Sequence, residues 1–211
     1  MKRSIIFSLA LTAALSASAQ KAITKTGIAV SEQPYVSQVW NPDLGNGMYK
    51  NPVINADYSD PDVVCVGEDY YMTASSFNCI PGLPILHSKD LVNWELIGHA
   101  VTKLQPKAVF DRPSHGNGVW APCISYHNGE FYIYWGDPDY GVFMVKTKDP
   151  AGKWEDPVCV IPGKGMIDTS PLWDEDGRVY LVNGWANSRN RFASVITVRE
   201  LNAEGTKAIS D

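Results

Sequence analysis

One short pattern occurs three times along the chain, and each copy has the form expected of a β-hairpin. Every copy has a short β-type run, a turn rich in Gly, Asp, Glu or Asn, and a second strand that opens on an aromatic pair or on Val-Tyr. The copies are DPDVVCVGEDYY (60–71), WAPCISYHNGEFY (120–132) and DTSPLWDEDGRVY (168–180). Counted back 11 or 12 residues from their closing tyrosines, they begin at Asp60, Trp120 and Asp168. The repeats therefore predict two carboxylates and one indole at equivalent positions, each just ahead of a β-strand.

Hairpins that recur at intervals of roughly 50 residues are typical of propeller blades. Strand-forming runs begin after Asn51 and give two units of four strands and one of three. These runs cover residues 63–66, 70–75, 85–87 and 94–97, then 123–126, 131–135, 142–147 and 154–158, then 172–174, 179–183 and 194–201. A fourth strand of the third unit has barely begun at Asp211. The sequence therefore predicts an all-β fold with somewhat under three blades.

The first residues have the organisation of a secretory signal peptide. A positively charged start precedes an apolar run over residues 5–15 and small residues at 17–19. Because this run is too short to anchor the chain in a bilayer, we expect residues 1–19 to be removed and the mature protein to be exported, free of the membrane, to the periplasm or outside the cell. Residues 20–48 are polar and rich in turn formers, which predicts an extended lead-in to a domain that spans 49–211.

Composition excludes one class of partner and favours another. The chain has a net charge of −5 and no cluster of Lys or Arg, so it lacks the electrostatic footprint of a nucleic-acid-binding protein. Seven Trp and ten Tyr suit a protein that stacks aromatic rings on sugars, although the same residues could form the core of the blades. The oligomeric state is left open by these features.

The cysteines and histidines do not have metal-ligand spacing. The four cysteines are far apart, and Cys65 and Cys123 fall in the first strands of two repeats among apolar neighbours. Export permits disulfides, but buried free thiols fit these positions equally well. The sequence therefore predicts no metal site, and it leaves the disulfide state open. The histidines without ligand spacing are His87, His99, His115 and His127.

The two repeated aspartates could be turn residues or catalytic groups. Asp-Pro occurs four times in the chain, and by itself it is a turn former. We accordingly interpret Asp137 and Asp139 in GDPDYG as turn or rim residues. Asp60 and Asp168 differ because the first strand of each blade lines the axis of a propeller, so residues at its entrance converge. Convergent carboxylates beside an indole are the elements of a sugar-hydrolysing pocket, with capping of the strand entrance as the alternative role for Asp60.

Longer segments resemble one enzyme family. NPVINADYSDPDVV, DYYMTASSFNCIPGLPILHSKDLVNWELIGHA, HGNGVWAP, EFYIYWGDPDYG and GKGMIDTSPLWDEDGRVYLVNGW are similar to glycoside hydrolase family 43, which contains β-xylosidases and α-L-arabinofuranosidases. The resemblance runs from about Trp40 to the last residue. It implies a five-bladed β-propeller, of which this chain would hold about the first three blades, and it implies no cofactor.

The resemblance also implies roles for individual residues. In this family an inverting mechanism uses a general base Asp, a second Asp that raises the pKa of the acid and orients it, and a general acid Glu. The base falls on Asp60 in SDPD and the second Asp on Asp168 in IDTSP, while Phe77 in SSFN and Trp120 in VWAP would form the apolar wall around the terminal sugar. No Glu stands in a matching motif, so we expect the acid to lie outside this chain. The two glutamates near the chain's end, in a strand end and a turn, are Glu200 and Glu204.

Three functions follow from these observations. The first is an inverting exo-glycosidase that removes terminal xylose or arabinofuranose from plant cell-wall oligosaccharides, for which this chain alone would be inactive. The second is a retaining fructan or sucrose hydrolase of a related five-bladed propeller family, although the Arg-Asp-Pro motif of those enzymes is missing. The third is a propeller that binds sugar without catalysis.

Overall fold

The computed structural model describes residues 37 and 39–210. The chain divides into an N-terminal unit, residues 1–41, and a compact unit, residues 42–211. In the first unit the Ser37 hydroxyl accepts hydrogen bonds from the backbone N–H groups of Val39 and Trp40. The predicted signal peptide and most of the predicted lead-in lie outside the described residues. The strands of the described residues and the functional residues discussed below belong to the compact unit.

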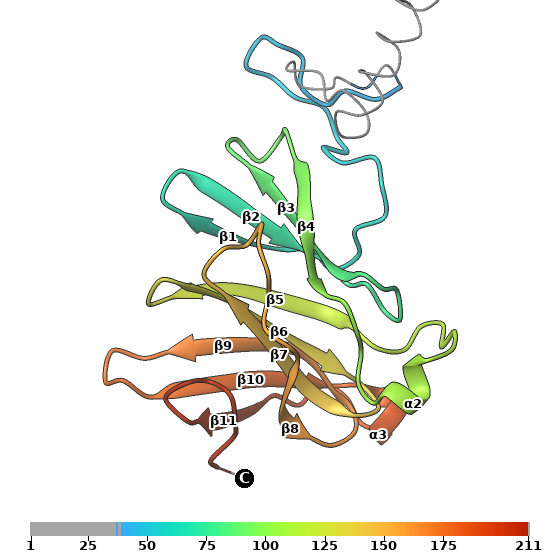
Figure 1. Ribbon diagram of the computed structural model, residues 1–211, viewed down its shortest axis with the longest axis vertical. Helices are drawn as coiled ribbons and strands as arrows, with labels where there is room; N and C mark the ends of the chain where they lie inside the picture. Colours follow the sequence, from blue (N-terminus) through green and yellow to red (C-terminus); the bar gives the residue numbers. More distant parts are fainter. Residues whose placement is uncertain (1–36, 38, 211) are drawn as a thin grey trace, which may run out of the picture. The chain divides into compact units, whose positions relative to one another are not determined.

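The compact unit consists of three antiparallel sheets, and each follows the chain from strand to neighbouring strand (Figure 1). The first sheet contains β1 (Asp62–Val66), β2 (Asp69–Thr73), β3 (Gly82–Ser88) and β4 (Glu95–Val101). The second contains β5 (Trp120–His127), β6 (Glu130–Asp137), β7 (Gly141–Thr147) and β8 (Val158–Pro162). The third contains β9 (Met166–Trp173), β10 (Val179–Trp185) and β11 (Thr197–Leu201). Two single-turn helices, α2 (Lys107–Phe110) and α3 (Asn187–Asn190), were not predicted from the sequence. The all-β class is therefore confirmed.

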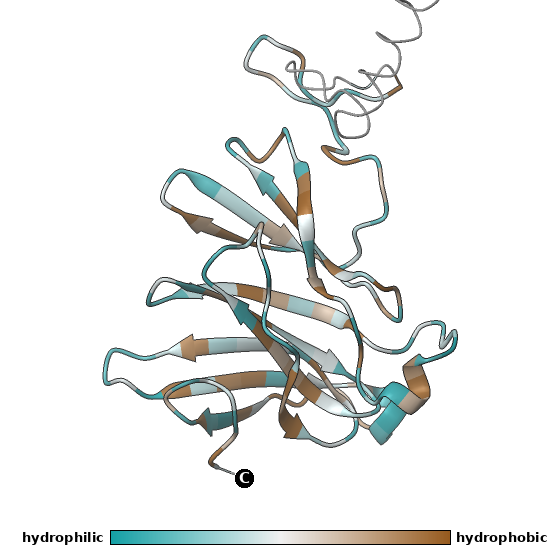
Figure 2. Cartoon of the chain, in the orientation of Figure 1, coloured by the Kyte–Doolittle hydropathy of each residue, from teal (hydrophilic) through white to brown (hydrophobic). Residues whose placement is uncertain are grey.

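The first strands of the three sheets contact one another in order, β1 with β5 and β5 with β9. Two apolar layers join the sheets, because alternate side chains of a strand point to opposite faces. On β6, Ile133 and Trp135 are buried with residues of the first sheet, whereas Tyr134 is buried with Leu181 and Leu201 of the third sheet. Figure 2 shows the resulting mixture of hydrophobic and hydrophilic positions along the strands. This packing fixes the entrances of β1, β5 and β9 relative to one another.

Several predicted strands differ from the structure at their ends, and two of them are clearly misplaced. The predicted strand over 154–158 is shifted, since β8 begins only at Val158. Trp154 is buried from a loop, where its indole donates to the carbonyl of Pro150. The predicted strand over 172–174 is too short, because β9 already begins at Met166. Pro171 is tolerated inside β9 because β9 is an edge strand.

The cysteines are free thiols, and the expectation that Cys65 is buried is wrong. Cys65 lies on β1 with the exposed Val63, on the face that points away from the second sheet. Cys123 is half-buried, and burial raises the pKa of its thiol to about 11. Cys79 and Cys159 are exposed.

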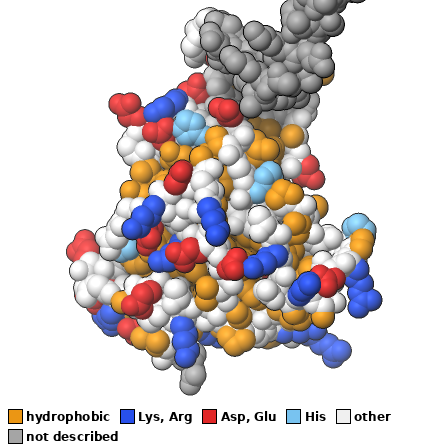
Figure 3. Space-filling view, in the orientation of Figure 1, with side chains coloured by type: hydrophobic (Ala, Val, Ile, Leu, Met, Phe, Trp, Pro, Cys, Tyr) orange, Lys and Arg blue, Asp and Glu red, His pale blue; other side chains and the backbone are white. Residues whose placement is uncertain are grey.

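The surface of the described residues is mixed in charge. On the face shown in Figure 3, Lys and Arg side chains are interspersed with Asp and Glu and do not gather in one basic patch. Within residues 37 and 39–210, no helix has the length and apolar character needed to cross a bilayer.

Candidate active site

Strand pairing places Asp60 and Asp168 at the same position of their sheets. The pairing register shifts at the entrance of β5 and at the entrance of β9. In the first sheet the corresponding point lies just before β1, where Ser59 accepts a hydrogen bond from the backbone N–H of Ser75. The residue at that point has a left-handed backbone, with φ of 50° for Asp60, 29° for Ala121 and 54° for Asp168. Such φ values are uncommon outside glycine and are found preferentially at functional sites. The first and third sheets therefore present a carboxylate from the same unusual backbone position.

The residue of the second sheet at this position is Ala121, so the predicted equivalence of Trp120 is wrong by one residue. An alignment on the closing tyrosines is offset wherever the hairpin turns differ in length. His127 pairs with Glu130 across a two-residue turn, whereas the turn between β9 and β10 is one residue longer. Trp120 is the first residue of β5 and Asp168 is the third of β9, so neither precedes its strand, whereas Asp60 does precede β1.

Phe77 and Trp120 are brought together through the backbone. Phe77 pairs with Val119, the residue before Trp120, through two backbone hydrogen bonds of 3.0 Å. Gly118 makes this approach possible, because a Cβ atom there would lie 2.4 Å from the carbonyl oxygen of Phe77. Phe77 also has a left-handed backbone, with φ of 50°. The loop after β2 is thereby fixed against the entrance of β5, and both aromatic side chains are half-buried.

The carboxylate of Asp60 is held by two hydroxyl groups. Ser59 and Ser75 each donate to Oδ2 of Asp60, at 2.9 and 2.8 Å. The Ser75 hydroxyl also accepts a hydrogen bond of 2.8 Å from the backbone N–H of Ala121. Asp60 is therefore tied to the entrance of the second sheet. Its other oxygen, Oδ1, has no hydrogen-bond partner within the described part of the chain.

Asp168 has a different environment. On β10, Gly184 pairs with Ile167, the residue before Asp168, just as Ser75 in the first sheet donates its backbone N–H to Ser59, the residue before Asp60. A Cβ atom on Gly184 would lie 3.7 Å from Oδ2 of Asp168, so the glycine cannot give this carboxylate the hydroxyl that Ser75 gives Asp60. Partial burial raises the pKa of Asp168, and the negative charge of Asp60 raises it further. The two carboxylates are thus close enough to interact electrostatically.

Trp120 is supported by two groups. Its indole N–H donates to the carbonyl of Gly116 at 2.7 Å, and the guanidinium carbon of Arg189 lies 5.4 Å from its ring centroid. Arg189 is in turn paired with Asp139. The prediction of a turn at GDPDYG is confirmed, because the side chain of Asp137 accepts the N–H of Asp139 at 3.0 Å. Burial raises the pKa of Asp137 to about 6.

Ser75 and Arg189 also belong to this site but were not predicted from the sequence. Ser75 had a detectable signal, since Ser75, Gly136 and Gly184 each stand four residues after a closing tyrosine of the repeats. Arg189 had no signal in the repeats, because it lies on α3 outside the hairpins.

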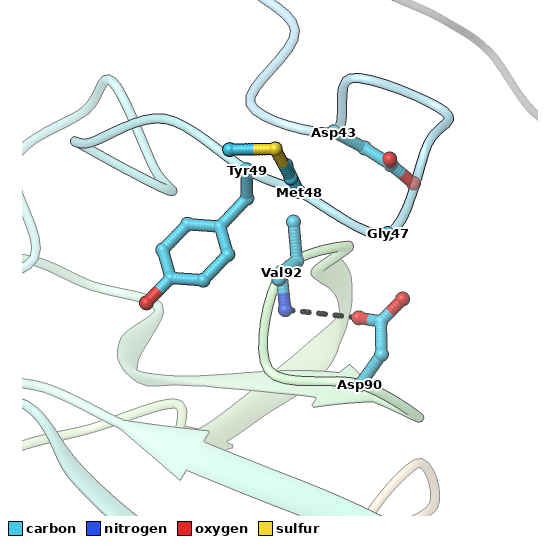
Figure 4. A pocket seen from close by; sticks show the side chains of 6 residues that line it. All are labelled: Asp43, Gly47, Met48, Tyr49, Asp90 and Val92. Carbon is cyan, nitrogen blue, oxygen red and sulfur yellow. Dashed lines mark hydrogen bonds between the residues drawn. The ribbon is translucent and has the colours of Figure 1, made fainter.

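The remaining candidates do not adjoin this site. Glu200 is on β11, two strands from β9 within the third sheet, and Glu204 is exposed in the turn that follows. Among the described residues no group of His, Cys, Asp and Glu could hold a metal ion. A hollow of about 320 Å³ lies between the segment before β1 and the turn between β3 and β4 (Figure 4). None of the predicted site residues lines it; the lining residues are Asp43, Gly47, Met48, Tyr49, Asp90 and Val92.

The sequence profile of the Glycosyl hydrolases family 43 matches residues 49–211. The chain belongs to this family. One relative, "Beta-xylosidase" of Formosa agariphila, is 35% identical over 179 residues, which is 80% of this chain and 30% of that protein. Another, "Non-reducing end alpha-L-arabinofuranosidase BoGH43B" of Bacteroides ovatus, is 40% identical over 147 residues, or 68% of this chain and 27% of that protein.

A solved structure of this family is also similar. The GH43 protein BlXynB of Bacillus licheniformis superimposes with a TM-score of 0.65 at 35% identity, over 77% of this chain and 32% of that protein. The chain therefore spans about 30% of the length of these relatives.

Proposed function

We propose that this chain provides the general base and the sugar-binding aromatic residues of an inverting exo-glycosidase. The enzyme removes terminal β-xylosyl or α-L-arabinofuranosyl residues from plant cell-wall oligosaccharides. The names of the relatives support this substrate class, since they are a β-xylosidase and an α-L-arabinofuranosidase. Asp60 acts as general base, Asp168 tunes and orients the acid, and Phe77 and Trp120 pack on the terminal sugar. The apparent signal peptide at residues 1–19 supports export to the periplasm or the outside of the cell.

The observation that carries this proposal is the pair of carboxylates at equivalent left-handed positions. In an inverting mechanism the base holds a water on the face of the sugar opposite the leaving group. The two serine hydroxyls orient Asp60 through Oδ2, and Oδ1 remains for such a water. Asp168 carries a second negative charge at the same site, which would raise the pKa of a nearby carboxylic acid and keep it protonated.

We further propose that the three sheets are blades of a five-bladed propeller. In the first sheet Val63 and Leu96 are exposed, at 40% and 49%, and in the third Leu172 and Val198 are exposed, at 55% and 57%. Further blades would cover such apolar side chains. The coverage of about 30% of the relatives leaves room for these blades and for the acid Glu.

Assays on p-nitrophenyl β-xyloside, p-nitrophenyl α-L-arabinofuranoside and sucrose test the proposed function. We expect the whole protein to hydrolyse one or both pentosides, with inversion visible by NMR as the opposite anomer in the first product. Sucrose turnover would support a fructan or sucrose hydrolase, and sugar binding without turnover would support a binding propeller. Residues 20–211 expressed alone should be inactive, and clean turnover by this piece would show that its catalytic set is complete.

A further inference from the structure

We propose that Arg189 is a positioning residue, which holds the indole of Trp120 in the orientation needed to receive a sugar ring. This inference rests on the proposed function. Arg189 lies on α3, directly after β10, the strand that faces Asp168. In Figure 1 this helix lies at the end of the third sheet.

Arg189 connects three segments that are distant in the sequence. Its Nε and Nη2 atoms donate to the two carboxylate oxygens of Asp139, at 2.9 and 3.1 Å, which is a bidentate pair. Nη2 also donates to Oδ1 of Asn117 at 3.3 Å, in the loop before β5. The side chains of Arg189 and Asp139 are only 21% and 25% exposed, so the pair is better shielded than a surface ion pair. The guanidinium is thereby fixed in one place.

The fixed guanidinium lies over Trp120. Its carbon is 5.4 Å from the ring centroid, within the range of a cation–π interaction. The indole N–H is held separately by the carbonyl of Gly116 at 2.7 Å. One edge and one face of the ring are thus occupied by protein groups, so a sugar would have to pack on the opposite face. An aromatic side chain that is locked before binding loses less conformational entropy when the ligand arrives.

Arg189 is better suited to positioning than to direct contact with substrate. The guanidinium has five N–H donors, and it makes four hydrogen bonds inside the protein, the fourth from Nη1 to the hydroxyl of Ser188 at 3.1 Å. Little donor capacity is left for a sugar hydroxyl. Its effect on binding should therefore depend on Trp120.

A double-mutant cycle in the whole protein tests this dependence. We expect Arg189→Met to raise KM about tenfold with kcat little changed, and to have no further effect in a Trp120→Ala background. Arg189→Lys keeps the charge but not the bidentate geometry, so it should raise KM less than Arg189→Met. Arg178→Met is the matched control, because Arg178 is 55% exposed in a hairpin turn, and it should leave KM unchanged.

The indole N–H resonance of Trp120 gives a second measurement that needs no turnover. Once assigned by its loss in Trp120→Phe, it should shift in Arg189→Met and stay in place in Arg178→Met. An unchanged KM, an equal increase of KM in both backgrounds, or an unmoved resonance would overturn the proposal. If the wild-type protein hydrolyses no pentoside, the proposed function fails, while the resonance still decides whether Arg189 positions Trp120.

Discussion

The first and third sheets hold a carboxylate at the same backbone position but surround it differently. Asp60 faces Ser75 and receives hydrogen bonds from two hydroxyls, whereas Asp168 faces Gly184 and receives none from the described residues. The pKa of Asp168 is raised by burial and by the charge of Asp60. The difference shows how a repeated strand entrance can supply two carboxylates with separate roles, because the residue opposite on the second strand sets the environment.

The largest effect is expected from Asp60→Asn in the whole protein. Loss of the base should lower kcat by ~10²–10⁴-fold while the sugar still binds, because the amide cannot accept the proton of water. The measurement is kcat and KM on the pentoside that the wild type prefers. Asp57→Asn, an exposed aspartate of the same segment, is the matched control. Activity within tenfold of the wild type would remove Asp60 from the mechanism.

A second effect should appear in binding. Trp120→Ala should weaken sugar binding by ~1–3 kcal/mol, the scale expected when an aromatic ring is removed from the wall of a pocket, and Phe77→Ala should act in the same direction. KM and the affinity for the free pentose measure this change. Trp94→Ala removes a half-buried indole whose N–H donates to the carbonyl of Leu91 in the first sheet, and it should leave KM unchanged. An unaltered KM in a folded Trp120→Ala variant would assign Trp120 to the core.

The serine opposite Asp60 should matter less than Asp60 itself. Ser75→Ala removes one hydroxyl from the carboxylate and one acceptor from the N–H of Ala121. A hydrogen bond to a charged group is worth ~1.5–3 kcal/mol, so we expect kcat to fall about tenfold or more. Ser75→Thr keeps the hydroxyl and should recover most of the activity. Equal losses in both variants would mean that Ser75 acts through packing.

The smallest effect concerns stability. A raised pKa means that the folded state binds the proton of Asp168 more tightly than the unfolded state does. The stability that this proton contributes is complete below the unfolded pKa of about 3.9 and is lost as pH rises through the folded pKa. Asp168→Asn should therefore raise Tm slightly at pH 7 but not at pH 3. A Tm difference of the same size at both pH values would show that the effect is not electrostatic.

Much of this arrangement could be predicted from the sequence. The hairpins follow from local patterns, in which strand-forming runs alternate with turn residues, so their existence and order were predictable. The same repeats made it possible to predict Asp60 and Asp168 as a related pair. The extent of β9 was not predictable, because tolerance of Pro171 depends on the strand being at a sheet edge. Trp154 was predicted to lie in a strand, but it is buried from a loop. Such burial depends on tertiary packing and leaves no local pattern.

The site was predicted incompletely for a similar reason. Trp120 was placed one residue away from the equivalent position, since the lengths of the turns become visible only through strand pairing. Arg189 could not be predicted, because its partners Asp139 and Asn117 lie 50 and 72 residues away. Interactions of this kind depend on how the sheets pack and not on a local pattern.

If Asp60 and Asp168 form an electrostatically coupled pair, the titration of Asp168 must respond to the charge of Asp60. The carboxyl carbon of Asp168, assigned by its loss in Asp168→Asn, can be followed by NMR against pH in the whole protein. In Asp60→Asn the pKa of Asp168 should fall, because one of the two causes of its rise is removed, and in Asp57→Asn it should stay in place. Gly184→Ser should also lower it, by adding the hydroxyl that Asp60 already has. A pKa of Asp168 that is the same in the wild type and in Asp60→Asn would show that the two carboxylates are not coupled.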